Sequence, residues 1–126
     1  EYTDSFFPTL GVGNARNMLR AGFTTVRNLG SQDYADVALK QGIEGGFYPG
    51  PRIVPATWSF GATGGHCGGG NLLPPSYKAL TERGVNGPEA VRYQVRENRK
   101  FGAGVIKVCA TGGVFSKNTE PGQQQM

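Results

Sequence analysis

The spacing of apolar side chains along the chain predicts three helices. Each predicted segment carries apolar residues three or four positions apart and stops at a glycine, which accepts the left-handed conformation found after many helix ends. The segments are residues 14–20, a segment from Ser31 or Asp33 as its cap to about Glu44, and residues 87–101. In the third segment, Pro88 lies in the first turn, where the helix does not need its missing N–H.

Three segments rich in β-branched and apolar residues predict strands that follow these helices. They are residues 23–29, 52–56 and 105–110. Strands that are connected through helices run parallel, with right-handed crossovers, so we expect an α/β domain with a parallel sheet. The second crossover is much longer than the first, and its excess, residues 57–86, is where we expect ligand contacts, because sites in such folds form on loops after strand ends.

The loop of residues 61–70 contains six glycines and His66, which is the only histidine of the chain. Glycine allows backbone N–H groups to approach a ligand closely and allows one side chain to project into a site. The same composition is also typical of a flexible surface loop with an incidental imidazole. Composition alone does not separate these two interpretations.

Lys107 lies in the third predicted strand, on the same face as Val105 and Cys109, because side chains alternate along a strand. The opposite face is the better candidate for packing under helices, so Lys107 would point into the interior of the sheet or barrel. Burial disfavours the charged ammonium, and an inward lysine is then a Schiff-base nucleophile, a general base or a carbamate that binds a metal. The alternative is an edge-strand lysine that extends to water.

Composition limits the classes of protein. The chain has 126 residues, among them 21 glycines and 8 prolines, which disfavours a helical bundle. A closed (β/α)8 barrel needs about 250 residues and is excluded. No apolar run is long enough to cross a membrane and the first residues lack the pattern of a signal peptide, so a cytoplasmic location is expected, with secretion of a longer parent left open.

The formal net charge is +4, and a basic cluster lies in the third predicted helix. Its members, at helical spacing on one face, are Arg92, Arg96, Arg99 and Lys100. Such a face can bind phosphate, but Glu89 and Glu97 lie beside it and no aromatic stacking platform accompanies it. We expect a solvated helix face, a small-molecule substrate, and neither a nucleic acid nor a membrane as partner.

The two cysteines, Cys67 and Cys109, are far apart in the sequence and form no Cys-x-x-Cys motif. This spacing gives neither a zinc ribbon nor a disulfide framework. Two free thiols in a reducing compartment are therefore expected.

Four segments carry a resemblance to a known family. They read AGFTTVRNLG at residues 21–30, PGPRI at 49–53, TGGH at 63–66 and IKVCATGGV at 106–114. In this order they resemble the amidohydrolase superfamily, within it the imidazolonepropionase-like branch that includes Xaa-Pro and Xaa-Arg dipeptidases. The resemblance implies a (β/α)8 barrel, of which residues 1–126 would form one incomplete domain holding about three strands, the second to the fourth. It also implies a parent that hydrolyses C–N bonds in dipeptides or N-acyl amino acids with one or two divalent ions, usually zinc.

The resemblance further implies roles for individual residues. Lys107 matches the lysine at the end of the fourth barrel strand, which is carboxylated and bridges two metals in binuclear members. His66 matches a histidine that holds the carbonyl or carboxylate of the substrate. The implied substrate-binding set is His66, Gly65, Thr111, Gly112 and Gly113.

The remaining family residues would lie outside this chain. A His-x-His pair would precede residue 1, and two further histidines and the catalytic Asp would follow Met126, so no complete catalytic set is present and the isolated chain is expected to be inactive. A parent that forms a homo-oligomer is compatible with this picture. The competing hypothesis is a small non-enzymatic α/β module that binds an anionic ligand through the glycine-rich loop and the basic helix face.

Overall fold

The computed structural model describes residues 3, 5–69, 71–77 and 84–126. In chain order its elements are α1 (Phe6–Arg20), β1 (Thr25–Asn28), α2 (Ala35–Glu44), β2 (Arg52–Pro55), the short 3-10 helix η1 (Pro75–Tyr77) and α4 (Gly87–Lys100). The chain divides into a first unit, Glu1–Trp58 with Asn98–Ile106, and a second unit, Ser59–Glu97 with Lys107–Met126. Within the described residues, no helix combines the length and the apolar character that a membrane crossing requires.

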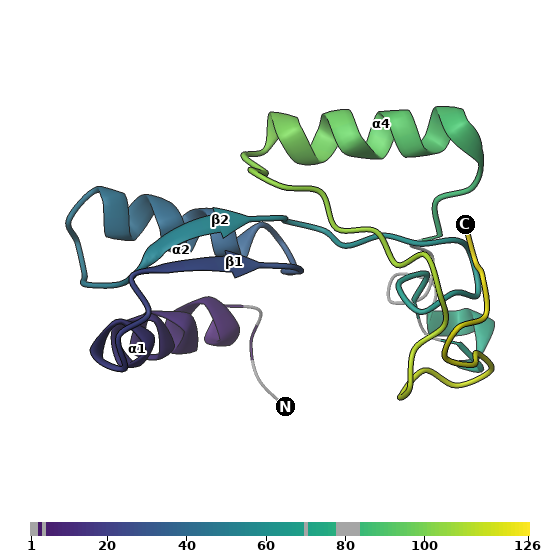
Figure 1. Cartoon of the computed structure of the whole chain (residues 1–126), viewed down its shortest axis with the longest axis horizontal. Helices are drawn as coiled ribbons and strands as arrows, with labels where there is room; N and C mark the ends of the chain where they lie inside the picture. The colour runs from purple at the N-terminus through teal and green to yellow at the C-terminus, as the bar shows by residue number, and fades with distance from the viewer. Residues whose placement is uncertain (1–2, 4, 70, 78–83) are drawn as a thin grey trace. The chain divides into compact units, whose positions relative to one another are not determined.

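The first unit is built on a parallel strand pair connected through a helix. β1 and β2 lie side by side and point the same way (Figure 1), with Thr25 opposite Arg52 and Asn28 opposite Pro55. α2 makes the crossover and packs against β2. Ile53 is buried in β2 on the side of α1 and α2, while Val54 is half-buried and lies near Gly104. The α/β class is confirmed. The first two predicted strands are also confirmed, and each is at least one residue shorter than expected.

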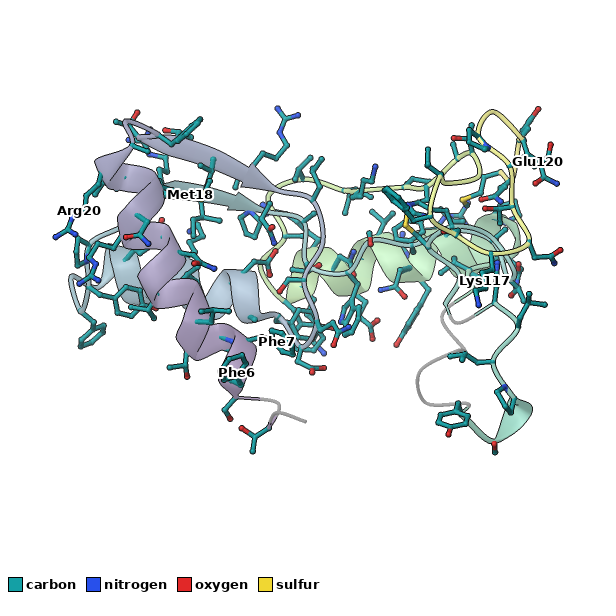
Figure 2. The ribbon with its side chains drawn as sticks, turned by 90° about the horizontal axis from the view of Figure 1, so that it is seen from below. Phe6, Phe7, Met18, Arg20, Lys117 and Glu120 are labelled. Atoms are coloured by element: carbon teal, nitrogen blue, oxygen red, sulfur yellow. A yellow bond between two sulfur atoms is a disulfide. The ribbon has the colours of Figure 1, made fainter. Side chains whose placement is uncertain are left out.

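The helix α1 begins eight residues earlier than predicted, at Phe6 instead of residue 14. Pro8 lies in its first turn, where the absent N–H is tolerated, and Gly11 and Gly13 lie inside the helix. A Cβ on Gly11 would lie 3.5 Å from a methyl carbon of Leu39 in α2, an ordinary van der Waals distance, so Gly11 lies on the face of α1 that packs against α2. Figure 2 shows Phe6 and Phe7 at the first end of α1 and Arg20 at the other.

The start of α2 differs in detail from the prediction, while its end agrees. The helix begins at Ala35 after Tyr34, which has a φ of +56°. Of the two predicted caps, Ser31 is the one that bonds the helix, because its Oγ accepts the N–H of Asp36 at 3.2 Å. The helix ends at Glu44, and Gly46 follows with a φ of +73°.

The helix α4 ends one residue before the predicted boundary, and Gly102 follows it with a φ of +105°. Its last turn contributes Asn98 to the first unit, where this side chain is fully buried. The Asn98 amide donates to the carbonyl of Trp58 at 2.8 Å. A polar side chain therefore fastens the chain after β2 to the end of α4.

The prediction of a third strand is wrong for the described residues. Residues 105–110 contain one parallel bridge, Phe60 to Val108, and no ladder. Two local features prevent one. The N–H groups of Gly104 and Val105 donate to one shared acceptor, the carbonyl of Pro55, at 2.8 and 3.3 Å, whereas a ladder uses successive acceptors. Thr57 after β2 has a φ of +61°, which interrupts the extended partner that residues 105–110 would need.

Over its described residues, the second unit contains loops, η1 and most of α4. Its buried apolar side chains include Phe60, Val85 and Cys109. Isolated bridges join Gly61 to Gly84 and Thr111 to Gln124, so separate loops contact each other without forming a sheet. This unit carries every residue predicted for the site.

Candidate active site

The glycine-rich loop folds back on itself over its described part, residues 61–69. The N–H of Gly65 donates to the carbonyl of Ala62 at 2.9 Å, and the N–H of Gly68 donates to the carbonyl of Gly65 at 3.0 Å. A Cβ on Gly68 would lie 2.2 Å from the Ala62 oxygen, so no larger residue fits there. Glycine therefore allows two consecutive tight turns, and His66 lies between them.

His66 is held by contacts to the C-terminal loop of the same unit. Its N–H donates to Oε1 of Gln125 at 2.9 Å, and its ring Nδ1 is hydrogen bonded to the hydroxyl of Ser116. A Cβ on Gly113 would lie 2.2 Å from Nδ1, so the ring lies directly against the Gly113 backbone. The ring is otherwise exposed. The structure thus brings together His66 and the 111–116 segment, although 50 residues separate His66 from Ser116.

Gly65, Thr111 and Gly112 lie in the same loops. Gly65 is buried, and a Cβ on it would lie 2.8 Å from Oε1 of Gln125. Thr111 is exposed and its backbone pairs with Gln124. The N–H of Gly112 donates to the carbonyl of Gln123 at 3.0 Å. The last residues of the chain therefore occupy the backbone groups of this segment.

Lys107 lies in the segment that pairs with Phe60. The N–H of Phe60 donates to the carbonyl of Lys107 at 3.2 Å, and the N–H of Cys109 donates to the carbonyl of Phe60 at 2.9 Å. Lys107 is half-buried, so its exposure is intermediate between that of a buried and that of an exposed residue. Two residues later, Cys109 is buried, whereas Val108 and Ala110 are exposed, so the face that was expected to pack under helices is not buried at these positions.

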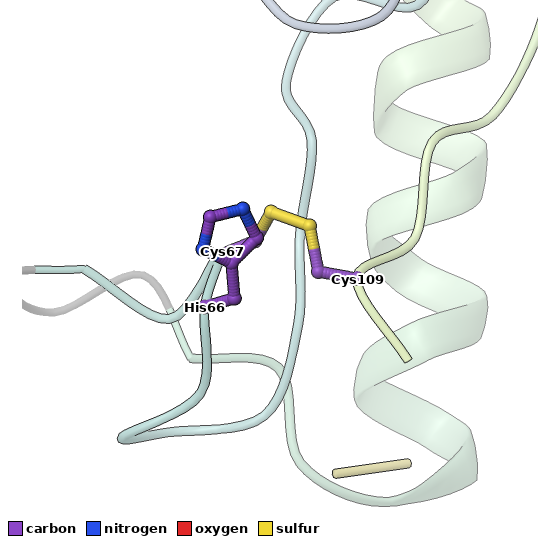
Figure 3. Close-up of side chains that lie close together, drawn as sticks. All are labelled: His66, Cys67 and Cys109. Carbon is purple, nitrogen blue, oxygen red and sulfur yellow. A yellow bond between two sulfur atoms is a disulfide. The ribbon is translucent and has the colours of Figure 1, made fainter. Parts of the chain in front are cut away.

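The expectation of two free thiols is wrong, because Cys67 and Cys109 form a disulfide. Their Cα atoms are 5.7 Å apart, in the range found for such bonds, although 42 positions separate them in the sequence. Figure 3 shows the His66 ring beside the two bonded sulfurs. Two widely separated cysteines carry no signal of pairing in one sequence, so only the fold reveals this bond.

The ligands that this chain offers to a metal do not form a centre by themselves. Among the described residues, one group of three or more His, Cys, Asp or Glu side chains has its ligand atoms within 4.8 Å of one another, namely His66, Cys67 and Cys109. The disulfide occupies both sulfurs, which leaves no thiolate. In this part of the chain Lys107 has no such group of acids and histidines around it, so a metal centre on Lys107 requires ligands from elsewhere.

A buried carboxylate that the sequence analysis missed lies in the first unit. Oδ2 of Asp36 accepts the N–H of Thr57 at 2.9 Å and the amide of Asn28 at 3.3 Å, and Oδ1 accepts the N–H of Val37 at 2.9 Å. It ties together the loops that follow β1 and β2, at the strand ends where α/β folds bind ligands. An acidic residue in the first turn of a helix after a strand was the available signal.

A cavity of about 530 Å³ also lies in the first unit, lined by residues of α1, α2, β1 and β2. Its lining is mainly apolar, with Phe7, Met18 and Leu39, and it reaches the polar side chains of Asn28 and Asp36. None of the predicted substrate or metal residues lines it. We therefore do not place the candidate site there.

Three of the four residues in the basic cluster of α4 have partners within the described part of the chain. Arg92 forms an ion pair with Glu89 one turn earlier. Nη1 of Arg99 donates to the carbonyl of Ala103 at 2.8 Å, and Nζ of Lys100 lies 5.1 Å from the ring centre of Phe101. These contacts favour the solvated helix face over the anion-binding module.

Comparisons with known proteins agree on one family. The sequence model of the amidohydrolase family matches residues 9–126. A Xaa-Pro dipeptidase with methionine bound in its active site is 32% identical, with a TM-score of 0.83 over 100% of this chain and 32% of that one. A prolidase in complex with N-methylphosphonate-L-proline is 35% identical, with a TM-score of 0.80 over 99% of this chain and 32% of that one.

A more distant structural relative is the ochratoxinase of A. niger, which is 25% identical with a TM-score of 0.82 over 94% of this chain and 30% of that one. No curated protein sequence matches the chain. The chain spans about a third of the length of the solved structures that it resembles. Since the family match covers almost the whole sequence, this chain belongs to the amidohydrolase family.

Proposed function

We propose that the protein containing this chain is a metal-dependent amidohydrolase that cleaves C–N bonds in dipeptides or related N-acyl amino acids. The observation that carries the proposal is the joining of His66 to the 113–116 segment within a chain that matches this family over residues 9–126. The similarity to a prolidase and a Xaa-Pro dipeptidase supports dipeptides as the first substrates to test.

His66 is proposed to hold the carboxylate or carbonyl of the substrate. Because Nδ1 is bonded to the Ser116 hydroxyl, Nε2 is the ring nitrogen that is left to face a ligand. The Gly113 backbone lies against the ring and limits its rotation. Gly65, Thr111 and Gly112 lie in the same loops and are proposed to line the substrate site with small or hydroxyl-bearing surfaces.

Lys107 is proposed to bind the metal as a carbamate. A carbamate places two oxygens and a negative charge at the end of a long side chain, which suits a ligand shared by two cations. The metal, proposed to be zinc with one or two ions, would supply an activated water and polarise the scissile carbonyl. This chain contributes one ligand of that centre, and the others are proposed to come from the remainder of the protein.

The test is the substitution Lys107→Ala in the intact protein, with Lys117→Ala as the matched control. Lys117 belongs to the same unit and is exposed, and its side chain has no role in the proposal. We expect Lys107→Ala to remove the bound metal and to lower the hydrolysis of Xaa-Pro dipeptides at least about 100-fold, since loss of even outer ligand contacts costs this much.

Metal content measured by elemental analysis and dipeptide hydrolysis are the two readouts. Lys117→Ala is expected to retain both. Retention of metal and activity by Lys107→Ala would contradict the metal-ligand role. Absence of any C–N hydrolysis by the metal-loaded wild-type protein would contradict the proposed function itself.

A further inference from the structure

The disulfide between Cys67 and Cys109 connects the two segments that carry the proposed site residues. Cys67 is adjacent to His66, and Cys109 lies two positions after Lys107. The backbone of Cys109 is fixed by its bond to Phe60, whose N–H in turn donates to Lys107. The bond is therefore a short covalent link between the His66 loop and the Lys107 segment.

The loop also makes hydrogen bonds to other segments of the second unit. His66 bonds to Gln125 and Ser116, and Asn71, just after the loop, bonds to the carbonyl of Lys117 at 3.0 Å. Thr63 bonds to Asn86, before α4. These partners hold the loop to the C-terminal residues and to the start of α4. Gln125 in turn donates its N–H to the carbonyl of Ala110 at 2.8 Å, so hydrogen bonds also connect the loop to the segment of Lys107, and the disulfide adds the covalent link.

Close packing around the bond restricts the loop further. A Cβ on Gly61 would lie 3.4 Å from Cβ of Cys67 and 3.5 Å from Cβ of Cys109, so the first residue of the loop lies between the two cysteines. The disulfide is thus the covalent constraint on the position of His66 relative to Lys107, beside the hydrogen bonds of Phe60 and Gln125, while the hydroxyl of Ser116 holds the ring.

We propose that the Cys67–Cys109 disulfide positions His66 relative to Lys107, and that its reduction weakens substrate binding. This inference rests on the proposed function, in which His66 holds the substrate. The two cysteines are positioning residues, because neither touches the substrate in this account. Substrate binding by the enzyme would then depend on the thiol–disulfide redox potential of its surroundings.

The reduction is a thiol–disulfide exchange with a small thiol such as glutathione. A first glutathione thiolate attacks Sγ of Cys67, which is the less buried of the two cysteines, and Cys109 leaves as a thiolate. A second glutathione then attacks the mixed disulfide and releases Cys67. Two electrons pass to the protein, which gains two protons as two thiols, and the glutathione pair leaves as its disulfide.

The experiment uses the intact metal-loaded protein and compares four forms. These are the oxidised wild type, the wild type treated with dithiothreitol, Cys67→Ser and Cys109→Ser. Mass spectrometry after thiol alkylation counts free thiols in each form. Steady-state hydrolysis of a dipeptide gives KM and kcat, and hydrogen exchange of the His66 amide reports the loop without any need for activity.

The oxidised protein is expected to show no alkylated cysteine at positions 67 and 109. Reduction and either serine variant should raise KM about tenfold, as loss of a positioning contact does, with little change in kcat. The serine variants should no longer respond to dithiothreitol. Exchange at the His66 amide should accelerate in the same forms, and reoxidation of the wild type should reverse both effects.

Three results would overturn the inference. The first is two alkylated cysteines in the protein purified under oxidising conditions. The second is an unchanged KM and unchanged His66 exchange after reduction. The third would be seen in protein loaded with cobalt. A thiolate-to-cobalt charge-transfer band in the reduced wild type that is absent from Cys67→Ser would show that the two cysteines bind metal together with His66. If no hydrolysis occurs but the thiol count and the exchange respond as expected, the proposed function fails and the cross-link remains.

Discussion

The two units of this chain are stabilised in different ways. The first unit buries apolar residues such as Ala15, Ile53 and Ala56 around a parallel strand pair and fixes its loops with the carboxylate of Asp36. In the second unit Phe60 and Val85 are buried, and its loops are joined by a disulfide and by hydrogen bonds from polar side chains.

This difference separates the unit that forms a scaffold from the unit that carries the candidate site residues. Regular elements pack into a stable unit from apolar periodicity alone, whereas loops that present functional groups need specific bonds to hold one conformation. His66 and Lys107 both lie in the second unit. The comparison predicts that breaking one cross-link in the second unit lowers the stability of that unit locally. It also predicts that changes in the buried polar network of the first unit lower the stability of the first unit.

The largest expected effect follows from removing the disulfide by Cys67→Ser with Cys109→Ser. Closing a loop of 42 residues contributes about 4 kcal/mol in the chain-entropy account. The free energy of local opening should fall by up to that amount at the amides of Phe60 and Cys109, measured by hydrogen exchange. The amide of Ala56 in the first unit, which donates to the carbonyl of Asn28, is the internal control. An equal change there would show that the two units do not respond separately.

Asp36→Ala should produce the next largest effect, and in the first unit. It leaves the buried N–H of Thr57 without its acceptor, at a cost of about 1 to 3 kcal/mol, while the Asn28 amide keeps the carbonyl of Gly30. The loss in the free energy of unfolding is measured by denaturant unfolding and by hydrogen exchange at the Thr57 amide. Asp33→Asn, at an exposed carboxylate just before α2, is the control; asparagine tolerates the φ of +49° at this position, and the change should alter stability by less than about 0.5 kcal/mol. Equal effects would contradict the anchoring role of Asp36.

Gly113→Ala tests the contact between the 113–116 segment and His66. The new methyl group would lie 2.2 to 2.7 Å from ring atoms of His66, so the ring must move. KM for a dipeptide should rise about tenfold, which corresponds to about 1.4 kcal/mol. Steady-state kinetics on the intact protein decide the matter, and an unchanged KM would mean that the ring position does not matter for binding.

The smallest effect is expected from Gly13→Ala, inside α1. Glycine is unfavourable in a helix interior, and no atom lies within 4 Å of the Cβ that alanine would add. The substitution should stabilise the first unit by about 0.5 to 1 kcal/mol and leave KM unchanged. Thermal unfolding measures the first effect, and a destabilised protein would show that α1 needs flexibility at this position.

Sequence patterns predict the first unit better than the second. The periodicity of residues 35–44 and the β-branched run at 25–28 are properties of local sequence, and both elements form where expected. The early start of α1 was not predicted, since Pro8, Gly11 and Gly13 are unfavourable in a helix interior; Pro8 lies in the first turn and α1 packs against α2. The third strand was predicted and does not form, because strand formation depends on a partner and Thr57 interrupts that partner.

Sequence patterns indicated residue types for the candidate site, but they did not indicate its contacts. His66 and Lys107 were singled out by a glycine-rich loop and by strand alternation. The hydrogen bond between His66 and Ser116 spans 50 residues, and the disulfide spans 42, so no local pattern encodes either. Asp36 was missed since a capping position and a buried anchor look alike until the loops around it are placed.

A high-resolution crystal structure of the intact protein with zinc and a non-hydrolysable dipeptide analogue tests the central claim most directly. The account predicts a carboxylated Lys107 that binds zinc and a His66 ring that contacts the carboxylate or carbonyl of the analogue, with Cys67 and Cys109 bonded. An unmodified Lys107 away from the metal, or an analogue bound away from His66, would contradict it.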